Sequence, residues 1–433
     1  MRKKIITLPN GGTILYKKNR KLQQTLVNFG FVVREIKKET YGVAHFLEHM
    51  LFKGTTTKTL SQFLDAKTEI CPSLNAYTSI SNLCIVFKRT NKKIEEAIAL
   101  ASDIILNPSL NKEDIEKEKN VILKELKLST DKRETLVAVA NRETMAKEPS
   151  FLAYSQVKVL GDEKIIKSIT RKKLLSYKQT LFKQNNFVCS VTTSLSKRKI
   201  TKLICEKLYN HLPFTKETLP EQSHIANKKS NVRVVSHERE NKFSYMLTFA
   251  IDKPYDKTRN DWNYSFVSSI LRKHIIRELR EKGLIYTSSI SISKAKEQFF
   301  LAIRIETTKE DFDKTFDIVI KNIYYLKANL VSQEEIDYIR ANFIYAEDEG
   351  EVRTFSSRNE GQLYAFLEYG KYYEALPRRK VLQNINSCNQ QSINKCFNEI
   401  FAADKVYLTI LGKDLNKKDY PTIKQLENII KKG

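Results

Sequence analysis

The two halves of this chain resemble each other, and this internal similarity limits the fold more than any other feature of the sequence. The segment LNKEDIEKE at 110–118 resembles VSQEEIDYI at 331–339, and LNAYTS at 74–79 resembles LIYTSS at 284–289. Each similarity is weak, but the offsets agree within the range that insertions and deletions produce. Because 433 residues also exceed what one core usually serves, we expect two homologous domains.

The apolar pattern places strands first, helices next and one strand last within each half. TLVNFGFVV at 25–33 and FSYMLTFAI at 243–251 are typical of early strands, and FVCSVTT at 187–193 and KVYLTIL at 405–411 are typical of closing strands. The first residues predict two strands joined by an Asn10-Gly11 turn. This order favours an α+β fold.

The segment 213–232 is the best candidate for a linker. It contains Pro213, Pro220 and few apolar residues, and it divides the chain almost evenly. We therefore expect a first domain at 1–212 and a second, homologous domain at 233–433.

Two of the six histidines stand four residues apart in TYGVAHFLEHMLF, residues 40–52. This segment has no helix breaker after Gly42 and is typical of a helix. On a helix, His45 and His49 lie about 40° apart around the axis and one turn apart along it, so both imidazoles face one side. Glu48 points to nearly the same side. The pattern H-x-x-E-H is the reverse of the H-E-x-x-H zinc-binding pattern.

A catalytic zinc ion takes three protein ligands and keeps one open position, so a third ligand has to come from another segment. The predicted helix at 111–129 offers four glutamates: Glu113, Glu116, Glu118 and Glu125. Glu118 and Glu125 are seven residues apart and share a face, and the apolar neighbours in VILKEL favour burial of Glu125. We predict Glu125 as the third ligand and Glu118 as the acid that supports the ligands.

Such a site predicts hydrolysis of a peptide bond. Zinc lowers the pKa of a bound water from nearly 16 to about 7, and Glu48 takes a proton from that water as general base and returns it to the leaving amine. The alternative is that these histidines are ordinary core or surface residues, as a single helical histidine usually is. The full pattern arises rarely by chance, which favours one zinc ion per chain.

The sequence also resembles the pitrilysin family of zinc metallopeptidases, the inverzincins, and within it the mitochondrial processing peptidase and its bacterial relatives. The resemblance runs from LPNGGTILYKK through GVAHFLEHMLFKGT, LNAYTS and IEKEKNVILKE to ELREKGLIY and VYLTILGK, and covers nearly the whole chain. Glu125 follows His49 by 76 residues, the usual spacing in the family. The resemblance implies two α/β-sandwich domains, each a mainly antiparallel sheet covered by helices, in a clamshell arrangement.

The resemblance adds residues that the spacing does not reveal. Asn75, Ala76 and Tyr77 match the edge strand on which such enzymes bind an extended peptide by β-strand addition, although an ordinary edge strand is the alternative. Arg280 and Tyr286 match family residues that hold the substrate carbonyl and the developing oxyanion. Taken alone, Arg280 is more typical of a solvated helix charge.

The second half lacks a complete ligand set, because the positions that correspond to Glu118 and Glu125 are Ile339 and Ala346. We expect this half to complete the active-site cleft. The resemblance implies a self-sufficient subunit that acts on unfolded peptides within an enclosed chamber, as a homodimer or as a heterodimer with a paralogue. The alternative is a non-catalytic peptide-binding or assembly subunit of a hetero-oligomer.

The net charge of +25 is concentrated in residues 1–220, which hold 40 Lys and Arg against 21 Asp and Glu. These residues are dispersed and no nucleic-acid motif accompanies them, so we interpret them as a solvated surface and keep nucleic-acid binding as the weaker alternative. Six scattered cysteines without a C-x-x-C pair favour reduced thiols. No apolar run approaches twenty residues, and the short apolar run near residue 5 does not fit a signal peptide, so we expect a cytoplasmic protein without a membrane span.

Overall fold

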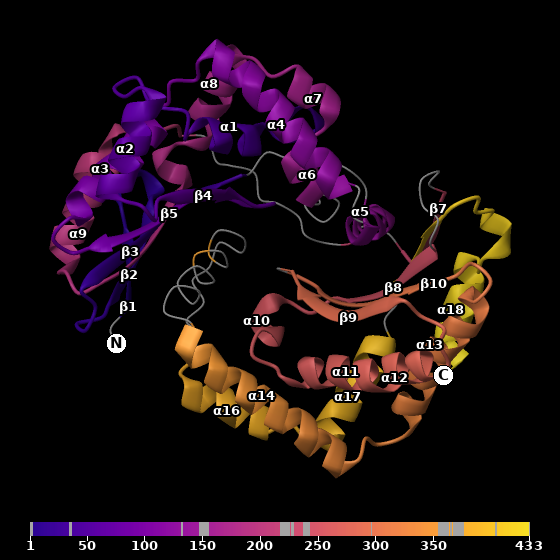
Figure 1. Ribbon diagram of the computed structural model, residues 1–433. Coiled ribbons are helices and arrows are strands. Elements are labelled where there is room, and N and C mark those ends of the chain that lie inside the picture. The colour runs from indigo at the N-terminus through magenta and orange to yellow at the C-terminus, as the bar shows by residue number, and fades with distance from the viewer. Residues whose placement is uncertain are drawn as a thin grey trace. The chain divides into compact units, whose positions relative to one another are not determined.

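Figure 1 shows the computed structural model of the chain. It describes residues 3–33, 37–130, 133–146, 156–216, 226, 229–236, 243–295, 297–353, 363, 366, 376–402 and 405–432. The chain divides into two compact units. The first consists of residues 1–130, 156–222 and 353–375, and the second of residues 131–155, 223–352 and 376–433.

The first unit is built on a six-stranded sheet in the order β1-β2-β6-β3-β5-β4. All neighbouring pairs are antiparallel except β2 and β6, which run parallel. The expected turn after β1 is confirmed: Asn10 and Gly11 have φ values of 60° and 92°, which suit a tight connection between twisted strands. The strands are β1 (Lys3–Thr7), β2 (Thr13–Lys18), β3 (Gln24–Val32), β4 (Asn75–Thr78), β5 (Asn82–Thr90) and β6 (Phe187–Thr193).

Helices cover one face of this sheet and form its main core. The β3 rings Phe29 and Phe31 contact Phe187 of β6 at centroid distances of 5.7 and 5.5 Å, and all three are buried against the helices. The helices are α1 (Val43–Met50), α2 (Leu60–Ile70), α3 (Ile94–Leu106), α4 (Lys112–Thr130), α6 (Gln156–Leu160), α7 (Glu163–Lys167), α8 (Arg171–Leu181) and α9 (Lys197–Lys207). Short 3₁₀ turns lie at Pro9–Gly11, Lys38–Thr40, Gln184–Asn186 and Tyr209–His211.

The second unit repeats this topology. Its five-stranded sheet has the order β7-β11-β8-β10-β9, with β7 and β11 parallel and the other pairs antiparallel. Strand for strand, this matches β2-β6-β3-β5-β4 of the first unit, which confirms the expected α+β fold with two similar halves. The strands are β7 (Asn231–Ser236), β8 (Phe243–Ile251), β9 (Thr287–Lys294), β10 (Phe299–Thr307) and β11 (Lys405–Gly412).

The helices of the second unit also follow the order of the first. Helices α11 to α12 stand between β8 and β9 as α1 and α2 stand between β3 and β4, and α13 and α14 follow β10 as α3 and α4 follow β5. The helices are α5 (Arg133–Met145), α10 (Tyr255–Thr258), α11 (Asn263–Leu271), the π-helix η5 (Arg272–Ile276), α12 (Arg277–Glu281), α13 (Phe312–Ala328), α14 (Gln333–Arg353), α16 (Arg378–Asn386), α17 (Gln390–Phe401) and α18 (Ile423–Lys432). A 3₁₀ turn lies at Lys417–Asp419.

Helix α5 precedes the expected boundary in the sequence but packs on the sheet of the second unit. The buried amide of Asn141 accepts hydrogen bonds from the hydroxyls of Thr248 and Thr409, both at 3.2 Å. The expected linker at 213–232 falls partly outside the described residues, so its role and the boundaries at 1–212 and 233–433 stay predictions. Among the described helices, none combines the length and the apolar character that crossing a membrane requires.

Candidate active site

Helix α1 carries the H-x-x-E-H pattern and is held tightly in the first unit. It starts after Gly42, whose φ is 80°, and a Cβ atom at Gly42 would lie 2.5 Å from the Cα of Gly161. Only glycine allows this close approach. The apolar face of the helix, including Phe46, Leu47 and Met50, is buried in the core. The opposite face is thereby fixed and presents the histidines.

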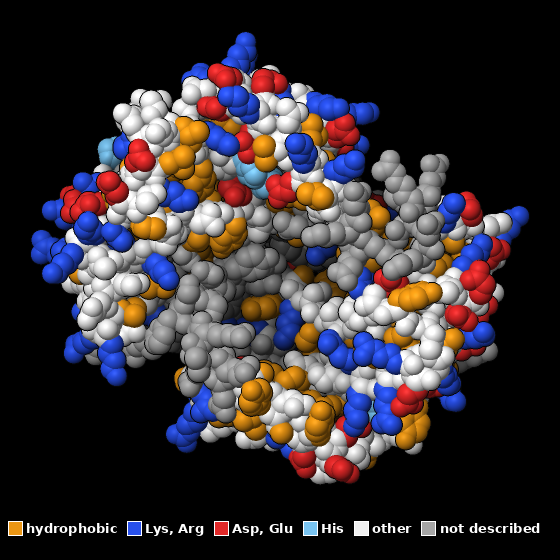
Figure 2. Space-filling view, in the orientation of Figure 1, with side chains coloured by type: hydrophobic (Ala, Val, Ile, Leu, Met, Phe, Trp, Pro, Cys, Tyr) orange, Lys and Arg blue, Asp and Glu red, His pale blue; other side chains and the backbone are white. Residues whose placement is uncertain are grey.

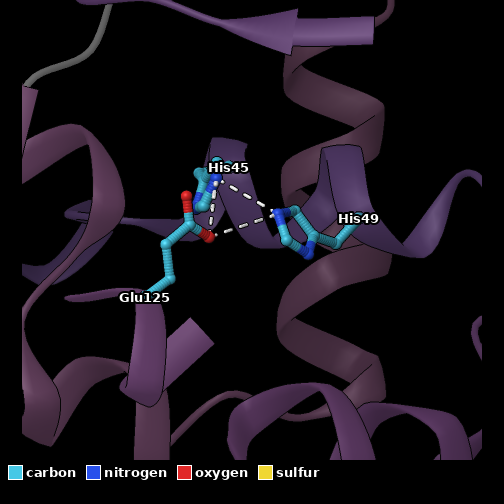
Figure 3. A group of neighbouring side chains, drawn as sticks. All are labelled: His45, His49 and Glu125. Atoms are coloured by element: carbon cyan, nitrogen blue, oxygen red, sulfur yellow. Dashed lines mark hydrogen bonds and ion pairs between the residues drawn. The ribbon is translucent and has the colours of Figure 1, made fainter. Parts of the chain in front are cut away.

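The structure brings His45, His49 and Glu125 together, as the sequence predicts (Figure 3). The Nε2 atoms of the two imidazoles lie 3.2 Å apart. The Oε2 atom of Glu125, which comes from α4, lies 3.8 Å from each of them. Figure 2 shows histidine atoms at the surface of the first unit, with acidic side chains beside them. Two imidazole nitrogens and one carboxylate oxygen therefore converge on one point.

The burial predicted for Glu125 is only partly correct. Its side chain is 45% exposed, whereas that of Glu118 on the same helix is 4% exposed. The reason is the orientation of α4: its buried line runs through Ile115, Glu118 and Ile122, and Glu125 lies at the margin of that line. The third donor is thus accessible from solvent, as an active site requires.

Glu118 takes the supporting position that the sequence predicts. Its Oε1 atom lies 2.7 Å from Nδ1 of His49, and its Oε2 atom lies 2.6 Å from Nζ of Lys53. Burial opposes ionisation, but the hydrogen bonds from Lys53 and His49 lower the pKa of Glu118 below its ordinary value. As an ionised carboxylate it only accepts, so Nδ1 of His49 donates and Nε2 keeps its lone pair.

These residues fit a divalent metal ion. Burial and the neighbouring His49 lower the pKa of His45 to about 4, so the imidazole of His45 stays neutral and able to ligate. Nδ1 of His45 is buried and has no hydrogen-bond partner among the residues that the structure describes. Two facing Nε2 atoms near a carboxylate oxygen gain most from a shared cation, and this donor set is typical of catalytic zinc.

Glu48 lies on the same helix as the two histidines and is half-buried. The hydroxyl of Thr78 donates a hydrogen bond of 2.7 Å to its Oε2 atom. Burial raises the pKa of Glu48 above its ordinary value, and the hydrogen bond from Thr78 opposes this shift. A half-buried carboxylate held in one orientation is chemically suited to proton transfer.

Asn75, Ala76 and Tyr77 lie on β4, which is an edge strand in the described part of the sheet. They pair with Val86, Ile85 and Cys84 of β5, respectively, which leaves the other edge of β4 unpaired among the described strands. Since Thr78 ends the same strand and bonds to Glu48, this edge lies beside the acidic group. An extended peptide can add to such an edge through its backbone.

Arg280 and Tyr286 lie in the second unit. Arg280 is an exposed residue of α12, and Tyr286, which directly precedes β9, is 65% exposed. The backbone N–H of Tyr286 donates to the carbonyl of Glu306 at 3.0 Å. That Arg280 and Tyr286 contact a substrate stays a prediction.

Sequence reasoning missed Lys53 and Thr78. A signal existed for Thr78, because residues two apart on a strand share a face and Ala76 is buried against the core. Lys53 follows His49 by four residues, the spacing of one helical turn, but a single lysine among many gives no reason to single it out.

Comparison with known proteins bears on this site. The insulinase model of peptidase family M16 matches residues 33–152, and the model of the M16 inactive domain matches residues 168–343; together they match more than half of the chain. The first match contains the three converging residues and Glu48. The second match coincides with the part of the chain in which the described residues hold no comparable cluster.

Individual proteins give the same picture. An uncharacterized zinc protease of Rickettsia felis is 24% identical over 429 residues, which cover 95% of this chain and 98% of that protein. The probable mitochondrial-processing peptidase subunit beta of Arabidopsis thaliana is 27% identical over 240 residues, which are 54% of this chain and only 44% of that protein. A solved protease structure from Helicobacter pylori has a TM-score of 0.78 at 16% identity, covers 95% of this chain and 99% of that one, and supports the fold alone.

Proposed function

Since the chain belongs to peptidase family M16, the insulinase or pitrilysin family, we propose that it is a zinc-dependent metallopeptidase that hydrolyses unfolded peptides. One observation carries the proposal. His45, His49 and Glu125 converge within 4.8 Å of one another, and Glu48 stands on the same helix as the histidines. The zinc-protease relatives support zinc as the metal.

His45, His49 and Glu125 would hold the zinc ion, which when bound acidifies water and polarises the carbonyl of the substrate. The edge of β4 binds the substrate as an added strand, with Asn75 exposed on that strand. Because the backbone makes these contacts, the enzyme accepts extended peptides of varied sequence. Folded proteins shield most of their strand edges, which favours unfolded chains as substrates.

Glu48 moves the proton in this mechanism. Its carboxylate takes a proton from the attacking water and delivers it to the nitrogen of the leaving amine. The hydroxyl of Thr78 holds one oxygen, Oε2, at 2.7 Å and so leaves Oε1 to face the water. Arg280 and Tyr286 are proposed to hold the substrate carbonyl and the oxyanion.

Three further expectations stay predictions: an enclosed chamber, a homodimer or a heterodimer with a paralogue, and a cytoplasmic location. Mitochondrial-processing peptidase beta subunits are among the relatives, which makes a paralogous partner worth testing. Analytical ultracentrifugation of the purified chain distinguishes a monomer from a homodimer.

The function is tested with a peptide library. The purified chain is incubated with unfolded peptides, with and without chelator, and the cut sites are read by mass spectrometry. We expect cleavage that the chelator abolishes and added zinc restores. Tight peptide binding without cleavage at any metal load would instead identify a non-catalytic peptide-binding subunit.

A further inference from the structure

Lys53 contacts the carboxylate that supports the metal-binding histidines. Its Nζ atom lies 2.6 Å from Oε2 of Glu118, while Oε1 of the same carboxylate lies 2.7 Å from Nδ1 of His49. The side chain of Glu118 is 4% exposed and that of Lys53 is 31% exposed. A nearly buried carboxylate thus has one partner on each oxygen.

This arrangement fixes the orientation in which the carboxylate of Glu118 faces His49. With Oε2 bound to the ammonium group of Lys53, Oε1 accepts the hydrogen bond from Nδ1–H of His49. That tautomer leaves the lone pair on Nε2, the atom that lies 3.2 Å from His45 and 3.8 Å from Glu125. If the carboxylate rotated, this tautomer would lose its preference.

The backbone around Lys53 is itself fixed against the start of α4. The hydroxyl of Ser109 donates to the carbonyl of Lys53 at 3.2 Å, and the N–H of Ser109 donates to the carbonyl of Gly54 at 3.2 Å. The N–H of Thr56 donates to the carbonyl of Asn107 at 2.8 Å. Since Asn107 and Ser109 belong to the segment that leads into α4, Lys53 is placed relative to the helix that carries Glu118.

We propose that Lys53 is a positioning residue of the metal site: it orients Glu118 and through it selects the tautomer of His49 that ligates zinc. This inference rests on the proposed zinc site, but it requires no catalysis. A residue that supports a ligand in this way typically changes metal affinity about 10- to 100-fold when it is lost.

The test compares three variants as whole chains. Zinc affinity is measured by competition with a chromophoric chelator, and the tautomer of His49 is read from nitrogen-15 shifts of the metal-free protein. Lys53→Met is expected to weaken zinc binding about 10- to 100-fold and to populate the Nε2–H tautomer. Lys53→Arg, which keeps the charge and the donors, is expected to restore most of the affinity.

Lys58→Met is the matched control, because Lys58 belongs to the same loop and bonds to a different carboxylate, Asp103, at 3.0 Å. It is expected to leave zinc affinity and the tautomer unchanged. Equal zinc affinity in Lys53→Met and wild type, or equal weakening in both methionine variants, would overturn the proposal. If Lys53→Met does not fold, Lys53→Gln is judged by the same measurements.

The two proposals can fail separately. A wild-type chain that binds zinc but cleaves no peptide refutes the peptidase, while the zinc affinities of the variants still decide the role of Lys53. Conversely, an active peptidase whose Lys53→Met variant binds zinc normally refutes only the positioning role.

Discussion

Each of the two units contains a histidine, a glutamate and a lysine, and the glutamate contacts the other two. In the first unit, Glu118 of α4 contacts His49 at 2.7 Å and Lys53 at 2.6 Å. In the second unit, Glu335 of α14 contacts His274 at 3.1 Å, and Lys273 lies 3.3 Å from the same carboxylate. The segment that bears His274 lies between β8 and β9, as α1 lies between β3 and β4, and α14 follows β10 as α4 follows β5.

The ring nitrogen that each histidine uses is what separates these two clusters. His49 bonds to its glutamate through Nδ1, so Nε2 remains for a metal ion. His274 uses Nε2 itself, which lies within 3.2 Å of both oxygens of Glu335. The first cluster also has two further donors, whereas the described residues of the second unit contain no metal-binding group of three. Contact between a histidine and a glutamate therefore does not make a metal site by itself. The glutamate has to bond to one ring nitrogen and leave the other free to bind the metal.

The largest expected effect comes from removing each histidine in turn. His49→Ala is expected to reduce zinc from one ion per chain to almost none and to abolish cleavage. His274→Ala is expected to keep the zinc and the activity, and to lower the free energy of unfolding by about 1–3 kcal/mol because Glu335 loses a partner. Metal analysis and urea unfolding measure both effects. Loss of zinc from the His274 variant would show that the second cluster is also a metal site.

Glu48→Gln separates the chemistry of the first unit from its metal binding. The amide cannot accept the proton, so we expect cleavage to fall about 10²- to 10⁴-fold while zinc content stays at the wild-type level. Peptide cleavage and metal analysis of the same sample provide the measurement. A variant that cleaves at the wild-type rate would exclude Glu48 as the general base.

A smaller effect is expected from Thr78→Val, which removes the hydroxyl that holds Glu48 and keeps the shape of the side chain. We expect kcat to fall about tenfold at unchanged zinc content, the effect of one lost hydrogen bond to a charged group. Thr78→Ser keeps the hydroxyl and is expected to restore kcat. Ser73→Ala is the control. Ser73 lies just before the start of β4, at the end remote from Thr78, and its hydroxyl donates to the backbone carbonyl of Lys88. Equal kcat in wild type and Thr78→Val would show that the hydrogen bond from Thr78 to Glu48 does not contribute to proton transfer.

Much of this comparison could be predicted from the sequence, because it depends on local periodicity. A helix with four-residue spacing puts His45 and His49 on one face whatever the rest of the fold, and seven-residue spacing does the same for Glu118 and Glu125. Alternation and turn residues likewise identify β3, β6, β8 and β11.

The other features of the fold and the site depend on which distant segments pack together. The pattern of a single sequence does not contain that information. No sequence pattern shows that α5 packs on the sheet of the second unit. The hydrogen-bond partners of its buried Asn141 are more than 100 residues away in the sequence. The contact of Lys53 is likewise set by the loop after α1, and that of Thr78 by the packing of β4 beside α1. The pair of His274 and Glu335 was not predicted, since an isolated histidine gives no periodic signal.

The smallest expected effect concerns the loop that follows α1, which the second unit replaces by the continuous run α11, η5 and α12. Asp103 fixes this loop: its Oδ2 atom accepts from the hydroxyls of Thr55 and Thr57 at 2.9 Å and from Lys58 at 3.0 Å. Burial opposes ionisation, but these hydrogen bonds and that of Asn107 lower the pKa of Asp103 below its ordinary value.

A depressed pKa in the folded state means that the stabilisation by Asp103 is complete above the unfolded pKa, about 4, and is lost as the pH falls through the folded value. We therefore expect Asp103→Asn to lower the free energy of unfolding by about 1–2 kcal/mol at pH 7 and by less near pH 3. Asp252→Asn in the second unit is the matched control. Its carboxylate also pairs with a lysine, Lys405, but is 67% exposed, so we expect a change below about 0.5 kcal/mol. Urea unfolding of both variants at the two pH values is the measurement. Equal effects of the two substitutions would show that Asp103, although partly buried, stabilises the loop after α1 no more than an exposed ion pair does.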